Sequence, residues 1–196
     1  MSQLRAETKA RRGLEPWALG LTVLAGILRL LPHPWNFAPA GAMSLFAGSR
    51  LQGWQAYLVP LLLMAATDPL RTSLYHPGFP AFRGETPFIY GSLLISVWIG
   101  RRWVQNPTVS RVAVAATAGS LQFFLITNAA AWLIEGMYPL TAAGLAACYI
   151  AAIPFLGNTL ASDLAYSGLL FGAYAWMLAR ARRAAVTATV SENAAA

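Results

Sequence analysis

Charged residues are scarce in this chain, and several motifs that carry chemistry are missing from it. Only 11% of the 196 residues are charged, and there is one cysteine, Cys148. A single cysteine excludes a disulfide framework and a thiol pair for metal or redox chemistry. The sequence also lacks a glycine-rich phosphate loop and a basic stripe with interleaved aromatics. We therefore set aside phosphate-loop and redox functions and expect no nucleic-acid partner.

Apolar residues, in contrast, make up 57% of the chain, which is more than a soluble domain would bury. The uncharged run Val112 to Ile134 alone exceeds the roughly 20 residues that cross a bilayer. The sequence predicts an all-α, polytopic membrane bundle of about six transmembrane helices, at about 15–31, 38–51, 54–68, 86–103, 109–134 and 158–180. A shorter apolar helix is expected at about 140–153, because Pro154 and Gly157 interrupt the pattern.

The basic residues lie between the apolar runs, and their distribution predicts the orientation. With the N-terminus inside and six spans, eleven of the 14 Lys and Arg residues lie on the inner side. Arg71 and Arg83 then lie outside, and Arg29 lies near the outer end of the first helix. A seventh span at 140–153 would move the C-terminal arginines outside, against this bias. We expect a bacterial cytoplasmic (inner) membrane protein with both termini cytoplasmic: a basic tail at 1–14, a transmembrane domain at 15–180 and a disordered tail at 181–196.

Most of the remaining polar residues fall near the predicted outer side. Ionisable groups inside a bilayer are costly, so they pair with one another or face an aqueous cavity. We expect Arg29 to pair with Asp163 or Asp68, either to hold helices together or to line a substrate cavity. Asn36 and Asn128 could instead cap a helix or bond across the bundle. The candidate ligand-binding residues are Arg29, His33, Asn36, Asp68, Asn128, Asn158 and Asp163.

Two further patterns bear on partners. The histidines and acidic residues have no metal-ligand spacing, so no metal site and no cofactor are expected. The last helix carries small residues that step by three and four and therefore share one face: Ala161, Ala165, Gly168, Gly172 and Ala175. Such a face lets another helix approach closely, either in this chain or in a separate membrane subunit.

The run from Arg29 to Pro39, continuing through Ala42 to Gly48, resembles the signature of an uncharacterised family of small bacterial membrane proteins described as energy-coupling factor (ECF) transporter S component-like. Further matches are Thr67-Asp68, Phe124 to Asn128, Met137 to Pro139, Ala147 to Phe155 and Asn158 to Tyr166. The resemblance covers about residues 15 to 180. It implies a six-helix substrate-binding subunit with both termini inside and a cavity that opens outward.

Three function classes are weighed. The leading hypothesis is a binding subunit for uptake of a small polar or vitamin-like molecule, which would work with a transmembrane coupling subunit and ATPases. The second is a structural or accessory membrane protein that docks a partner complex through small-residue helix faces. An intramembrane enzyme using His33, Asp68 and Asp163 is disfavoured, because no nucleophile-plus-base spacing supports it. We therefore predict that the protein is not an enzyme. Besides the small molecule and the coupling subunit, we expect membrane lipid as a partner.

Overall fold

The computed structural model describes residues 15–194, and in this range the chain is all helical, with six helices and no strand. The basic tail predicted at 1–14 lies outside the described residues. The helices are α2 (Glu15–Leu28), α3 (Ala40–Arg50), α4 (Gln55–Tyr75), α5 (Thr86–Trp103), α6 (Val109–Ile134) and α7 (Ala142–Ala194). All six lie where the apolar runs predict a helix, so the all-α fold class is confirmed.

Local sequence signals explain several helix ends. Thr108 caps α6, since its hydroxyl oxygen accepts a hydrogen bond of 3.2 Å from the N–H of Arg111. After α6, Gly136 has a φ of 68°, a left-handed conformation that favours glycine, and the chain turns back into α7. Arg101 and Arg102 in the last turn of α5 complement the negative end of that helix.

Helix α3 is the centre of the bundle and contacts all five other helices. Every residue from Ala42 to Ser49 is buried. Its tightest neighbour is α5: a Cβ on Gly48 would lie 1.9 Å from the carbonyl oxygen of Val97, and one on Gly100 would lie 2.0 Å from that of Leu45. Reciprocal glycines therefore let the two backbones touch, as in close helix pairs of membrane proteins.

The separate short helix predicted at 140–153 is wrong. That segment is helical, but it is the beginning of α7, which runs through Pro154 without a break. A proline inside a helix removes one N–H donor and crowds the carbonyl four residues earlier, and α7 continues through Pro154 despite both effects. The segment also packs along α6, where the Tyr149 hydroxyl donates to the carbonyl of Leu125 at 2.7 Å and the ring of Tyr149 meets that of Phe124. Tertiary packing therefore keeps the segment aligned with the rest of α7.

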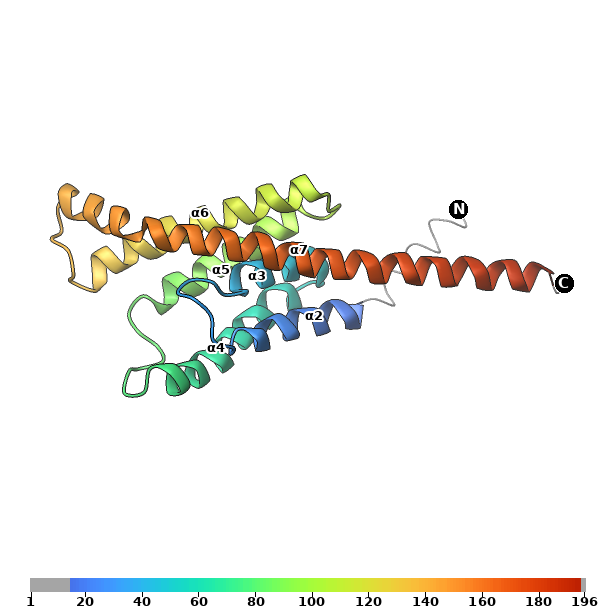
Figure 1. Ribbon diagram of the computed structural model, residues 1–196, viewed down its shortest axis with the longest axis horizontal. Coiled ribbons are helices and arrows are strands. Elements are labelled where there is room, and N and C mark those ends of the chain that lie inside the picture. Colours follow the sequence, from blue (N-terminus) through green and yellow to red (C-terminus); the bar gives the residue numbers. More distant parts are fainter. Residues whose placement is uncertain (1–14, 195–196) are drawn as a thin grey trace.

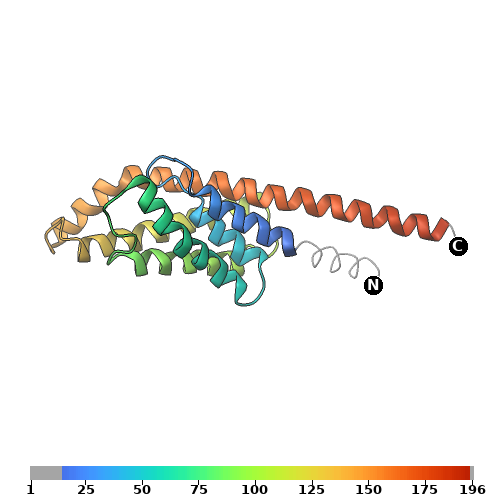
Figure 2. The same ribbon diagram turned by 90° about the horizontal axis from the view of Figure 1, so that it is seen from below.

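Helices α6 and α7 form a long antiparallel hairpin, and α7 continues well beyond the bundle toward the C-terminus (Figures 1 and 2). A helix rises about 1.5 Å per residue, so the 53 residues of α7 span about 80 Å. The predicted disordered tail at 181–196 therefore begins as a continuation of α7, which reaches Ala194.

Many large apolar side chains are exposed on the outside of the bundle, whereas several small polar side chains are buried beside its apolar core. Exposed examples from five helices are Leu24, Leu62, Trp98, Leu121 and Leu169. Buried serines are Ser44, Ser49, Ser92, Ser96, Ser120, Ser162 and Ser167. Two helices, α6 and the Ala142–Ala184 part of α7, are long and apolar enough to cross a membrane. Only 28% and 17% of their most apolar windows are buried inside the protein.

Candidate functional site

Most of the predicted polar residues lie at one end of the bundle, around the connection between α2 and α3. Four of the seven candidates, Arg29, His33, Asn36 and Asp163, line a single cavity of about 280 Å³. A second cavity of about 360 Å³ adjoins it and is lined by Asp68 together with Arg29. Residues far apart in the sequence therefore share one site.

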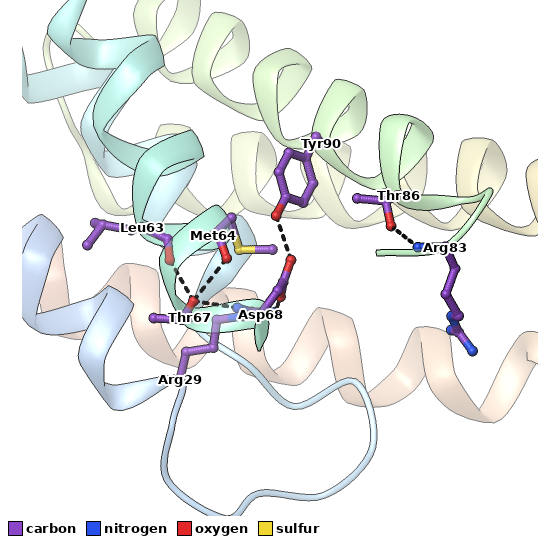
Figure 3. A network of polar contacts seen from close by, with 8 residues as sticks. All are labelled: Arg29, Leu63, Met64, Thr67, Asp68, Arg83, Thr86 and Tyr90. Carbon is purple, nitrogen blue, oxygen red and sulfur yellow. Dashed lines mark hydrogen bonds and ion pairs between the residues drawn. The ribbon is translucent and has the colours of Figure 1, made fainter. Parts of the chain in front are cut away.

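The Arg29 side chain is tied to α4. Its guanidinium forms an ion pair with Asp68, and it donates a hydrogen bond of 2.6 Å to the hydroxyl of Thr67 (Figure 3). The second oxygen of Asp68 accepts a hydrogen bond of 2.6 Å from the hydroxyl of Tyr90 on α5. Of the two pairings predicted for Arg29, the one with Asp68 is confirmed, and none forms with Asp163. This network therefore joins the residue that follows α2 to α4 and α5.

Asp163 takes a different role, at the N-terminus of α3. It is 4% exposed, and one carboxylate oxygen accepts a hydrogen bond of 3.0 Å from the N–H of Ala42. The other oxygen accepts one of 2.7 Å from the hydroxyl of Ser120 on α6. Pro39, at the usual capping position, provides no side-chain cap. Asp163 therefore caps α3 from another helix, and its negative charge lies at the positive end of the helix dipole.

Two other residues of α7 hold the loop between α2 and α3. Asn158 donates a hydrogen bond of 2.9 Å to the carbonyl of Trp35, and Ser162 donates one of 2.7 Å to the carbonyl of Ala38. The spacing 158, 162 and 163 places these side chains on one face of α7, toward the loop. Asn158 does not line either cavity, so its observed role is to fix the loop that does.

Asn36 and Asn128 neither cap a helix nor form a side-chain hydrogen bond to another helix. Asn36 has a φ of 57° in the loop, a left-handed conformation that asparagine tolerates, and it borders the 280 Å³ cavity. Asn128 lies elsewhere: its amide donates to the carbonyl of Phe124 in its own helix, and it lines neither cavity. Hydrogen bonds within α6 therefore satisfy its side-chain donor.

Comparison with known proteins gives one match. A family of unknown function, DUF6580, matches residues 13–187, which is most of the chain. The chain belongs to DUF6580. No match was found among curated proteins or among solved structures. Each of the sequence runs quoted for the resemblance falls inside the matched range of DUF6580.

Two arginines of this DUF6580 chain line the site although they lie outside the predicted ligand set, Arg71 and Arg83. Arg83 forms an ion pair with Glu85, whereas Arg71 makes no hydrogen bond or ion pair to a described residue. The sequence held a signal for Arg71, because it follows Thr67 and Asp68 by four and three residues on one helix. The predicted end of that helix at 68 hid the signal, since α4 runs through Pro69 to Tyr75.

Apolar side chains complete the 280 Å³ cavity of the DUF6580 chain. Its walls include Met64, Ile89, Leu93 and Phe123. An apolar body with a few polar groups at its edges is the usual make-up of a small-molecule site. Among the described residues, no group of three His, Cys, Asp or Glu side chains could hold a metal ion.

A larger cavity, of about 600 Å³, lies at the other end of the bundle, between the connections that follow α3 and α5. None of the seven candidate residues lines it. Its basic residues, Arg50 and Arg101, belong to those that the charge distribution assigns to the cytoplasmic side.

The small-residue face of α7, which consists of Ala161, Ala165, Gly168, Gly172 and Ala175, is exposed along its whole length. A Cβ on Gly168 or Gly172 would meet nothing within 4 Å. The packing of α7 in this chain uses other positions, including Ser167, Leu170, Phe171 and Tyr174. The small-residue face therefore has no helix partner within the described part of the DUF6580 chain.

Proposed function

We propose that the protein crosses the bacterial inner membrane with its six helices and that the α2–α3 connection faces outward. Support comes from the large apolar side chains on the outer faces of five helices, which lipid would cover. The inner faces, in contrast, carry the serines and the ion pair that a bilayer would exclude. Both polar cavities near Arg29 then lie at the outer end, opposite the cytoplasmic arginines.

Within that membrane setting, the protein is a substrate-binding subunit for uptake of a small polar or vitamin-like molecule. The observation that carries this proposal is the 280 Å³ cavity, which combines apolar walls with polar residues from several elements. A binding role agrees with the use of Asp68 and Asp163 in fixed hydrogen bonds, since neither side chain is left to act as a base. No chemical step on the substrate is proposed.

Native mass spectrometry of the protein purified in detergent tests this function. A small molecule that co-purifies with the wild-type chain is expected. Thr159→Trp should remove that molecule, because Thr159 lines the cavity and its hydroxyl bonds only to Phe155 in its own helix. Thr187→Trp is the matched control: Thr187 makes the same type of bond, to Arg183, on the exposed extension of α7. A molecule that both variants retain would contradict binding in this cavity.

Transport would need an energising partner, and the resemblance to S components suggests a transmembrane coupling subunit with ATPases. The surface that such a partner could contact includes the exposed small-residue face of α7. Co-expression with candidate coupling subunits, followed by purification through a tag on this chain, tests the association.

The exposed face of α7 also favours a second candidate function, an accessory membrane protein that docks a partner complex and binds no small molecule. This alternative predicts a stably co-purified protein subunit and an empty cavity in native mass spectrometry. Gly172→Leu would then abolish the association, because a branched side chain would hold a partner helix away.

A further inference from the structure

The three arginines near the cavity differ in their partners. Arg29 is paired with Asp68, and Arg83 is paired with Glu85. Arg71 lines the 280 Å³ cavity and two adjoining cavities of about 360 and 190 Å³, yet it has no hydrogen bond or ion pair among the described residues. Its Nε atom is buried without an acceptor.

No carboxylate that lines these cavities forms an ion pair or a hydrogen bond with Arg71, although the charge of Asp68 attracts it, and Glu85 is paired with Arg83. Arg29 and Tyr90 use the two oxygens of Asp68, while Ser120 and the N–H of Ala42 use those of Asp163. Part of this guanidinium is buried without a hydrogen-bond partner, so an anion from outside the chain would stabilise it. A planar guanidinium matches a carboxylate or a phosphate, with two parallel hydrogen bonds.

His33 provides a second unused group beside Arg71. Its Nδ1 lies 3.0 Å from the carbonyl oxygen of Pro34, and a carbonyl only accepts, so Nδ1 carries the proton. The other ring nitrogen, Nε2, is buried without a partner. In the neutral ring that nitrogen accepts a hydrogen bond, which an O–H or N–H group on a bound molecule would supply. Both side chains line the same two cavities.

The apolar walls of the cavity indicate what the rest of the bound molecule is like. Met64, Ile89, Leu93 and Phe123 form an apolar compartment of the 280 Å³ cavity. That volume is at the lower end of the range for small-molecule sites and leaves no room for the two acyl chains of a phospholipid.

We infer that the substrate is a small amphipathic anion, with its carboxylate or phosphate on Arg71, a neighbouring hydrogen-bond donor on His33, and an apolar body against Met64, Leu93 and Phe123. This inference rests on the proposed substrate-binding function. The ion pair with Asp68 occupies Arg29, so Arg71 is the arginine that recognises the anion.

The test uses the full chain in lipid nanodiscs and matched pairs of probes, each an anion with its neutral counterpart. The pairs are 4-hydroxybenzoate with 4-hydroxybenzamide, hexanoate with hexanamide, and phenyl phosphate with phenol. Binding is measured by native mass spectrometry and by the shift in unfolding temperature, together with the mass of any co-purified molecule. The variants are Arg71→Gln and Arg71→Lys, and the matched control is Arg102→Gln, an exposed arginine outside the cavities.

We expect the wild type and Arg102→Gln to prefer the anion of at least one pair, and Arg71→Gln to bind that anion about tenfold more weakly or worse. The neutral counterpart should bind the wild type and Arg71→Gln equally. Arg71→Lys should keep part of the preference, since it retains the charge but loses the planar fork. If Arg71→Gln does not fold, the inference is tested by two measurements: the preference of the wild type for the anion over its neutral counterpart, and the weaker preference expected of Arg71→Lys.

The failures are distinguishable. A co-purified molecule or probe that is neutral, or an anion whose affinity Arg71→Gln leaves unchanged, overturns the anion inference while the binding function stands. A phospholipid as the only molecule lost from Arg71→Gln also overturns the inference, because it makes Arg71 a lipid contact. If no probe and no co-purified small molecule binds the wild type, both the inference and the proposed function fail.

Discussion

Asp163 of α7 and Ala42 of α3 are 121 positions apart in the sequence, yet the carboxylate of one accepts a hydrogen bond of 3.0 Å from the backbone N–H of the other. Gly41 permits this approach, because a Cβ on it would lie 2.4 Å from the nearer carboxylate oxygen. The buried acid is therefore part of the bundle's construction, since it replaces the cap that Pro39 does not provide.

The first prediction concerns this cap. Asp163→Ala should lower the free energy of unfolding by about 1–3 kcal/mol, because the N–H of Ala42 and the hydroxyl of Ser120 lose their shared acceptor. Asp163→Asn should cost less, since its amide oxygen can still accept from Ala42. Unfolding by sodium dodecyl sulfate, followed by circular dichroism in mixed micelles, measures both. Equal midpoints for Asp163→Ala and the wild type would contradict the capping role.

A second prediction tests the contact between α3 and α5. Gly48→Ala and Gly100→Ala should each destabilise the protein strongly, because the new methyl group would overlap a backbone carbonyl, that of Val97 or of Leu45. Backbone atoms cannot move aside as a side chain can, so the helices must separate. Gly91→Ala on the same α5 is the control, since its methyl group would meet nothing within 4 Å. Thermal unfolding in detergent should place Gly91→Ala at or slightly above the wild type.

The sequence predicted the helices well because apolar run length and charge placement are local properties. It also predicted that Arg29, His33, Asn36 and Asp163 would lie on the same side, since helix ends alternate between the two sides of a bundle, and in the structure the four line one cavity. Local properties did not predict that the segment 140–153 continues into the last helix. A proline marks a weak point in the local pattern, whereas the packing of Tyr149 against α6 is a long-range contact.

The sequence predicted which residues lie in the site better than it predicted which of them pair with one another. Charge alone allowed Arg29 to join either Asp68 or Asp163, and both acids lie on its side of the bundle. Three-dimensional packing decided the pairing, because Asp163 is taken by the amide end of α3. The extension of α4 past Pro69 brought Arg71 into the site, and no local rule required a helix to continue there.

A third prediction tests whether the ion pair between Arg29 and Asp68 stabilises the fold. The Arg29 and Asp68 side chains are 10% and 15% exposed, so breaking this pair leaves a largely buried charge. Arg29→Gln and Asp68→Asn should each cost about 3 kcal/mol of unfolding free energy, by analogy with other buried pairs. The double variant should cost clearly less than the two single losses together, because no lone charge remains. A double-mutant cycle in mixed micelles gives the coupling energy, and strict additivity would contradict the pairing.

A fourth prediction concerns the two sides of α7. Gly172→Leu lies on the exposed small-residue face and should leave the unfolding free energy unchanged or raise it by up to about 1 kcal/mol, because leucine favours a helix more than glycine does. Ser167→Leu lies on the buried side, at 0% exposure, and should destabilise the bundle by overpacking. Unfolding curves of the two purified variants provide the comparison. A large loss for Gly172→Leu in the isolated chain would place this face inside the fold.

The last prediction addresses the orientation in the membrane, on which the outward position of the cavity depends. Cys148 is 4% exposed and is replaced by Ser to give a cysteine-free background. Phe79→Cys, in the exposed connection between α4 and α5, should react with a membrane-impermeant maleimide added to intact spheroplasts. Gln105→Cys, between α5 and α6, should react only after the membrane is opened, because that connection is flanked by Arg101, Arg102 and Arg111. Labelling of Gln105→Cys from outside would invert the bundle and place the Arg71 cavity on the cytoplasmic side, which would exclude capture of an external substrate there.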